Sequence, residues 1–80
     1  MPKYQKVYYN KIGLMIRVEL ARRGESMPLR EVVADMSKKL SLGLDPKRVQ
    51  AVLGSKVVEK YEYIDGVMKI TTMVVPCNSS

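Results

Sequence analysis

Four side chains between positions 47 and 51 have the types and spacing that could read nucleic-acid bases. Arginine can make two hydrogen bonds to guanine, glutamine can make two to adenine, and the methyl group of alanine can contact that of thymine. They follow Asp45-Pro46, a pair that favours the start of a helix. The first turn of a helix also presents free N–H groups to phosphate. We therefore predict that the base-facing residues are Lys47, Arg48, Gln50 and Ala51.

Polar side chains before and after this segment could hold a phosphate backbone. The predicted phosphate contacts are Lys38, Lys39, Ser55, Lys56 and Lys60. The chain has a formal net charge of +6, and its basic residues gather in two segments, 1–23 and 46–60. Such segments suit a surface that faces phosphate. The alternative is a charged, solvated surface that keeps a small protein soluble, and charge alone does not separate the two.

Residues that commonly carry catalysis or bind metals are almost absent. The sequence has no histidine and a single cysteine, Cys77, which lies within its last four residues. Histidine is the usual general base and metal ligand, and one thiol cannot form an internal disulfide. The carboxylates are scattered, and no glycine-rich phosphate loop is present. We predict no enzymatic activity, no metal site and no cofactor.

Length and hydropathy predict one small domain. Eighty residues suit a single domain, which we place at residues 1–75 with a tail at 76–80. Hydrophobic residues make up 46% of the chain, which is ordinary for a globular protein. No apolar run approaches the ~20 residues of a membrane span, and no leader sequence opens the chain. We expect a cytoplasmic protein without a membrane partner.

Apolar residues at helical spacing predict a first helix over residues 4–23, capped by Gly24. Its broad apolar face would consist of Tyr4, Val7, Tyr8, Ile12, Leu14, Met15, Val18 and Ala21, opposite a stripe of Lys6, Asn10, Gly13 and Arg17. This apolar face would cover the domain core or pair with a second copy of the helix. Tyr4, Tyr8 and Tyr9 could instead stack on single-stranded bases, although helical spacing favours a packing role for Tyr4 and Tyr8.

Two shorter helices follow. Pro28 suits the first turn of the second helix, with Ser26 or Met27 as its cap and an end near Leu40 or Ser41. Its apolar residues recur at helical spacing: Leu29, Val32, Val33, Met36 and Leu40. The third helix begins after Asp45 and ends near Gly54, with Val49, Val52, Leu53 and Val57 facing inward.

The last segment changes to alternating apolar and polar residues. Asp65-Gly66 predicts a two-residue hairpin turn, which pairs Ile64 with Val67 and continues outward to Glu59 with Thr72. One face then carries Tyr61, Tyr63, Met68, Ile70 and Val74, and we expect it to cover the core. The other face places Glu62 opposite Lys69, an oppositely charged pair.

This order of elements resembles the winged helix-turn-helix superfamily. The resemblance rests on residues 29–34, as the first helix of the motif, and on residues 44–53, as its turn and recognition helix. It implies an α+β fold, mainly α, with three helices followed by a C-terminal two-stranded β-hairpin. It also implies a double-stranded DNA-binding protein, a transcriptional regulator or DNA-associated accessory factor, with its recognition helix in the major groove.

Two departures and three alternatives accompany this resemblance. Residues 37–44 are about four residues longer than the usual tight turn, and the hairpin tip, residues 64–67, carries no basic residue. The main alternative is a protein-interaction module within a replication, transcription or ribosomal assembly. RNA binding shares the charge argument. Small regulators of this type also form homodimers through terminal helices, and the N-terminal helix is the candidate here.

Overall fold

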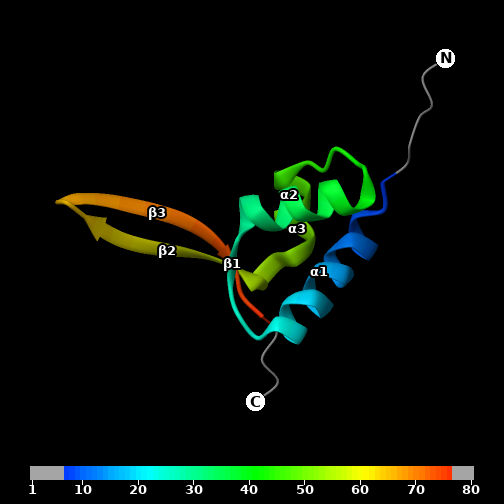
Figure 1. The fold of residues 1–80 in the computed structure, drawn as a ribbon, viewed down its shortest axis with the longest axis horizontal. Helices are drawn as coiled ribbons and strands as arrows, with labels where there is room; N and C mark the ends of the chain where they lie inside the picture. The colour runs from blue at the N-terminus through cyan, green and yellow to red at the C-terminus, as the bar shows by residue number, and fades with distance from the viewer. Residues whose placement is uncertain (1–6, 77–80) are drawn as a thin grey trace.

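The computed structural model describes residues 7–76, which form three helices and a small antiparallel sheet (Figure 1). The elements in chain order are α1 (Tyr9–Arg23), β1 (Met27–Pro28), α2 (Leu29–Leu40), α3 (Pro46–Leu53), a 3₁₀ turn η1 (Gly54–Lys56), β2 (Val57–Ile64) and β3 (Val67–Val74). Three helices followed by a hairpin confirm the predicted α+β fold. Strand β1 was not predicted, and it extends the sheet to the order β1-β3-β2.

Helix α1 begins later than the sequence indicates and buries a different face. Val7 and Tyr8 precede the helix, while residues 4–6 lie outside the described part of the chain. The prediction for Gly24 is confirmed, since it adopts a left-handed φ of 70° and donates its N–H to the Leu20 carbonyl at 2.8 Å. The inward residues are Ile12, Gly13, Ile16 and Leu20.

The predicted apolar face of α1 was therefore largely wrong. Leu14 and Val18 are 60% and 61% exposed, and Tyr8 and Met15 are also exposed. Gly13 was placed on the outer stripe but is buried, and a Cβ atom there would lie 2.9 Å from Cγ2 of Val52. The error arose because α1 carries apolar residues on two sides. Periodicity alone cannot choose between the sides, whereas the close approach of α3 requires glycine.

The start of α2 also differs from the prediction. Met27 and Pro28 are extended and pair with Val74 and Met73 of β3, so Pro28 precedes the helix instead of occupying its first turn. Neither Ser26 nor Met27 caps α2. The predicted end is confirmed at Leu40, where Ser41 adopts a left-handed φ of 54°.

Helix α3 follows the sequence prediction closely. Asp45 is the N-cap, its carboxylate accepts the Lys47 N–H at 3.0 Å, and Pro46 is the first helical residue. Val49 and Leu53 are fully buried, while Val52 and Val57 are partly buried. Helix α3 ends at Leu53 before Gly54, whose φ is 55°.

The hairpin has the predicted turn and register. All pairs from Ile64–Val67 to Glu59–Thr72 are present, and the register continues to Val57–Val74. Asp65 and Gly66 have φ values of 53° and 78°, as a type I′ turn requires. Glu62 lies opposite Lys69, although the ion pair recorded for Glu62 is with Lys60, at 4.0 Å.

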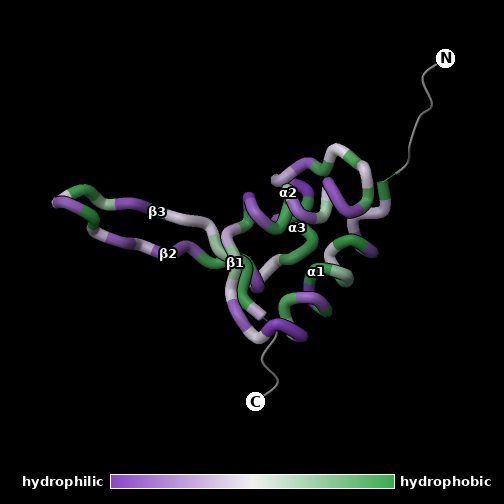
Figure 2. The backbone as a smooth tube through the Cα atoms, viewed as in Figure 1, coloured by the Kyte–Doolittle hydropathy of each residue, from purple (hydrophilic) through white to green (hydrophobic). Residues whose placement is uncertain are grey.

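This hairpin, Val57–Val74, is called the wing below, and most of it does not cover the core. Figure 1 shows it extending away from the three helices. Of the five residues expected to face the core, only Val74 is buried, while Tyr61, Tyr63, Met68 and Ile70 are exposed. Figure 2 shows hydrophobic residues near the wing tip, with hydrophilic and intermediate residues along the strands between the tip and the base. The alternation correctly predicted a strand face, but the strands are too long for the small helical body to cover.

The core lies between the helices and the base of the wing. Its buried hydrophobic residues are Ile12, Ile16, Leu20, Leu29, Val32, Val33, Met36, Leu44, Val49, Leu53 and Val74. Each helix supplies one apolar side, and Val74 closes the end nearest the sheet. This core fixes α3 with one face inward and the other free.

Candidate nucleic-acid interface

The four residues predicted to face bases share the free side of α3. All are exposed: Lys47, Arg48, Gln50 and Ala51. Val49 and Leu53, at 0% exposure, hold the opposite side of the helix in the core. At the start of α3, the Asp45 carboxylate accepts the Lys47 N–H at 3.0 Å and the Asp45 carbonyl accepts the Arg48 N–H at 3.1 Å, so the side chains and not free backbone N–H groups characterise this surface. The exposed helix therefore offers a cation, a guanidinium, an amide and a methyl group on one surface.

Tyr9 connects α1 to the start of this surface. The Arg48 guanidinium lies over the Tyr9 ring, 5.4 Å from its centroid. The Tyr9 hydroxyl also accepts the backbone N–H of Asp45 at 3.0 Å. One aromatic side chain thus supports both the cap of α3 and its arginine. The sequence prediction missed this role, because no local pattern relates Tyr9 to residues 36 or more positions away.

Further contacts fix α3 against α1. Arg17 donates to the Val52 carbonyl at 3.0 Å, near the C-terminal end of α3. Gly13 packs against the side chain of Val52. With Tyr9 near one end of α3 and Arg17 near the other, the orientation of the exposed surface is set by α1.

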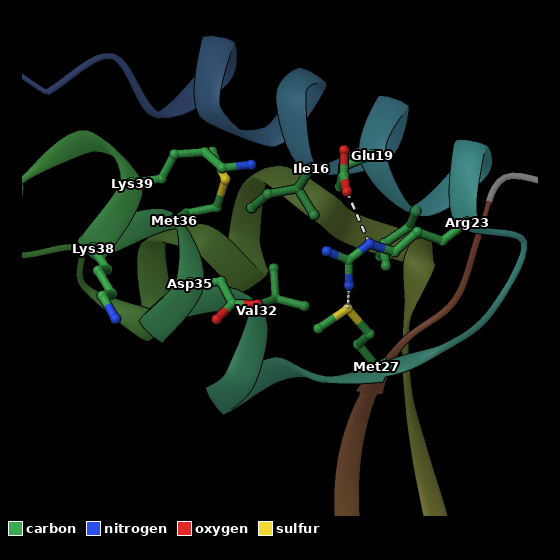
Figure 3. A pocket seen from close by; sticks show the side chains of 10 residues that line it. Ile16, Glu19, Arg23, Met27, Val32, Asp35, Met36, Lys38 and Lys39 are labelled. Carbon is green, nitrogen blue, oxygen red and sulfur yellow. Dashed lines mark hydrogen bonds and ion pairs between the residues drawn. The ribbon is translucent and has the colours of Figure 1, made fainter.

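The two predicted phosphate contacts on α2 border a different feature. Lys38 and Lys39 line a groove of about 410 Å³ between α1 and α2, whose apolar wall includes Ile16, Leu20, Val32 and Met36. Figure 3 shows Lys39 beside Met36 and Ile16. A helix rotates about 100° per residue, so Lys39 lies on the opposite side of α2 from Arg30, an exposed residue nine positions earlier. The groove beside Lys39 is therefore on a different side of α2 from Arg30.

The arginines at the end of α1 are already paired. Glu19 accepts from Arg22 at 2.7 Å and from Arg23 at 2.8 Å. These hydrogen bonds from Arg22 and Arg23 lower the pKa of Glu19, and the bond to Glu19 raises the pKa of Arg22. Arg23 also contacts the Met27 sulfur at 3.3 Å, as Figure 3 shows. These two cations are therefore less available to phosphate.

Two basic residues that the sequence prediction missed lie nearer to the start of α3. Arg30 of α2 and Lys69 of β3 line a second groove, also of about 410 Å³, together with Pro46, the first residue of α3. Arg30 could have been predicted from the sequence, because it is a polar residue on the side of α2 that faces away from the core. Lys69 could not have been found in this way, because its position depends on how the wing leaves the body.

The remaining predicted phosphate contacts follow α3 along the chain. Ser55 and Lys56 lie in η1, directly after the helix, and Lys56 is partly buried. Lys60 is exposed on the wing, where its ammonium group lies 4.0 Å from the Glu62 carboxylate. The structure therefore brings Ser55 and Lys56 close to α3 in the chain and places Lys60 on a separate projection.

Residues 7–76 contain no group of three or more potential metal ligands. None of the helices in that range has the length and apolar character that a membrane crossing requires.

No protein-family model, curated protein or solved structure matches this chain.

Proposed function

We propose that the protein binds double-stranded DNA by inserting α3 into the major groove, as a transcriptional regulator or DNA-associated accessory factor. The observation that carries the proposal is the exposed face of α3, where Lys47, Arg48, Gln50 and Ala51 lie together. Helices of this kind contact base edges through their N-terminal residues. The order helix, turn, helix, hairpin resembles the winged helix-turn-helix arrangement and supports the same proposal.

Phosphate contacts would come from the sides of α3. Arg30 and Lys69 border the groove beside Pro46, and Ser55 and Lys56 follow the end of the helix. The wing tip, residues 64–67, carries one acidic and no basic side chain. We therefore assign the tip no DNA contact, and restrict the role of the wing to its base and to Lys69.

The test is fluorescence anisotropy with a labelled random duplex across a salt series. Each neutralised phosphate contributes about −0.9 to the slope of log affinity against log salt. We expect micromolar binding and a slope that corresponds to several contacts. Absence of binding at low salt, by a protein whose circular dichroism shows a folded state, would contradict the proposal. A single-stranded RNA and a duplex RNA of matched length separate DNA from RNA binding.

A protein-interaction module is the second candidate, favoured by the exposed apolar side chains of the wing. Tyr61 and Tyr63 are 60% and 73% exposed, and Ile64, Val67, Met68 and Ile70 are exposed as well. Affinity capture after nuclease treatment tests this candidate. A stoichiometric partner that is retained by the native protein and lost on replacing Tyr61 and Tyr63 by serine would support it.

A further inference from the structure

The outer edge of strand β2 has no neighbour among the described residues. The sheet order β1-β3-β2 leaves this eight-residue strand with one paired side and one open side. A long open edge is a template for pairing with another strand. An isolated two-stranded hairpin is also only marginally stable in water, and added strands stabilise it. The wing therefore gains from a partner along β2.

The turn determines which residues present their backbone groups to this open edge. The two-residue turn joins Ile64 and Val67 by a hydrogen bond, and bonded pairs then recur at every second residue. Lys56 follows the same alternation, since its carbonyl accepts the Val75 N–H at 2.8 Å. The even-numbered residues of β2 thus bond to β3. The N–H and C=O groups that point to the open edge are those of Glu59, Tyr61 and Tyr63.

The side chains of β2 complement those of a second β2 strand that runs in the opposite direction. Tyr61 lies at the centre, with Lys60 and Glu62 of opposite charge on either side. Val58 and Ile64, both apolar, follow at equal distances from the centre. When two antiparallel copies align about Tyr61, Lys60 lies opposite Glu62 of the second copy, and Val58 lies opposite Ile64 of the second copy. Glu59 then lies opposite Tyr63 of the second copy, which completes the row of hydrogen-bonded pairs.

The neighbouring registers are unfavourable. Because odd-numbered residues must pair with odd-numbered residues, the two-fold axis can move only to Lys60 or to Glu62 without greatly shortening the overlap. An axis at Lys60 would place two ammonium groups opposite each other, and an axis at Glu62 would place two carboxylates opposite each other. Like charges directly opposite destabilise a strand pair. Charge and hydrogen-bond direction therefore select the same alignment.

We propose that the open edge of β2 is a homodimer interface, in which two copies pair antiparallel about Tyr61 to form one six-stranded sheet of order β1-β3-β2-β2-β3-β1. The exposed apolar side chains Tyr61, Tyr63, Met68 and Ile70 share one face of the wing, so the dimer joins two such faces into one. The two Tyr61 rings become direct cross-strand neighbours on that face. This interface differs from α1, and its formation does not depend on nucleic-acid binding.

Light scattering coupled to size-exclusion chromatography tests the register by charge reversal in the full chain, without nucleic acid. We expect a mass of twice 9.1 kDa for the native protein. Lys60→Glu and Glu62→Lys should each shift the mass toward 9.1 kDa, since each places like charges opposite each other. The double variant should restore the dimer, because both charged pairs across the interface are again of opposite sign; within each wing, the new lysine at position 62 then lies opposite Lys69 in both Glu62→Lys and the double variant. Glu25→Lys, an exposed charge reversal on the loop after α1, is the matched control and should leave the dimer unchanged.

Disulfide trapping tests the same interface independently. Hydrogen-bonded antiparallel pairs have Cα atoms about 5.5 Å apart, a separation that a disulfide can bridge. With Cys77→Ser as background, Tyr61→Cys should form a covalent dimer rapidly under mild oxidation. Lys69→Cys is the control, because it lies on β3, one strand away from the axis, and should cross-link slowly.

Several results would overturn the proposal. A native protein that stays monomeric at millimolar concentration excludes the interface. Failure of the double charge reversal to restore a dimer in a protein with native circular dichroism excludes this register. A dimer that is dispersed by Val18→Asp on α1 but unaffected by Lys60→Glu places the contact on the helix. None of these outcomes depends on whether the protein binds DNA, so the two proposals can fail separately.

Discussion

Arg48 both contacts the ring of Tyr9 and is exposed on the surface of α3. Its guanidinium lies over the Tyr9 ring while its position on α3 leaves it exposed to solvent. A cation that is held over an aromatic ring loses less conformational freedom on binding than a free one. Tyr9 is itself fixed, because its hydroxyl accepts the Asp45 N–H. Within the proposed function, Tyr9 is thus a positioning residue and Arg48 the contact.

Replacing Arg48 separates base reading from general attraction. We expect Arg48→Ala to weaken binding to a specific site by about 1–3 kcal/mol and to weaken binding to random DNA much less. The measurement is anisotropy with both duplexes at one salt concentration. Equal losses on the two duplexes would remove the base-reading role and leave Arg48 as a phosphate contact.

Arg30 and Lys39 form a matched pair for phosphate contact, since both are exposed cations on α2. Arg30 lines the groove beside Pro46, whereas Lys39 lines the groove beside α1. We expect Arg30→Ala to make the slope of log affinity against log salt less steep by the contribution of about one phosphate contact. Lys39→Ala should leave that slope nearly unchanged. The reverse result would support the phosphate contact that the sequence predicted for Lys39 and would place the DNA on the α1 side of α2.

Two variants of Tyr9 separate its two contacts. Tyr9→Phe keeps the ring under Arg48 but removes the acceptor for the Asp45 N–H, and should lower the free energy of unfolding by about 0.5–1.5 kcal/mol. Tyr9→Leu removes both contacts and should also weaken specific DNA binding. Urea denaturation and anisotropy measure the two effects. A DNA affinity that is unchanged in Tyr9→Leu would show that Arg48 needs no support from the ring.

At the scale of elements, the contact between α1 and α3 orients the proposed interface. Gly13 of α1 faces Val52 of α3, whose side chain lies in the space that a Cβ atom at position 13 would enter. Arg17 adds a hydrogen bond to the Val52 carbonyl at 3.0 Å. Since α1 carries no other small residue on its inner side, this is the position at which the helix packing is most sensitive to size.

Gly13→Ala adds one methyl group and tests whether helix propensity or packing against α3 dominates the stability at this position. At an exposed helix position, alanine is more favourable than glycine by about 1 kcal/mol. Overpacking a well-filled contact costs about 1–3 kcal/mol, and the branched Val52 side chain has little freedom to move aside. We therefore expect Gly13→Ala to destabilise the protein in urea denaturation. In a Val52→Ala background the same change should become neutral or stabilising, and persistent destabilisation there would contradict the packing explanation.

Local sequence signals predicted most of the helices and strands. The features that they did not predict depend on tertiary packing. Asp45-Pro46 and Asp65-Gly66 fix a helix start and a turn through their own backbone preferences, so both were read correctly. The four exposed residues of α3 follow from that helix start. Met27-Pro28 becomes a strand only because β3 lies beside it, and no local pattern contains that information. The inner side of α1 likewise depends on which side α3 approaches.

At the scale of the whole molecule, a helical body and a projecting wing share the charge unequally. The molecule measures 52 × 33 × 19 Å, and the wing contributes to its long axis (Figure 1). Residues 57–74 carry two basic and three acidic side chains, so the net positive charge of the chain lies outside the wing. Cations on the body suit nucleic acid, whereas an apolar wing of nearly balanced charge suits protein. Apart from Lys69 of the wing, the two proposed interfaces thus occupy different parts of one small chain.

The scarcity of contacts between the wing and the body also has a consequence for the opening of the fold. At its base, Met73 and Val74 pair with β1 and β3 packs against α2, whereas farther out the wing is held mainly by bonds between β2 and β3, which are near neighbours along the chain. It is therefore a cooperative unit of its own, able to open while the helices stay closed. We expect amide protons of Glu62 and Lys69 to exchange with deuterium orders of magnitude faster than those of Ile16 and Leu53 in dilute solution. Protection of the wing that rises with protein concentration would mark association of its strands, whereas uniform protection across the chain would show one closed unit.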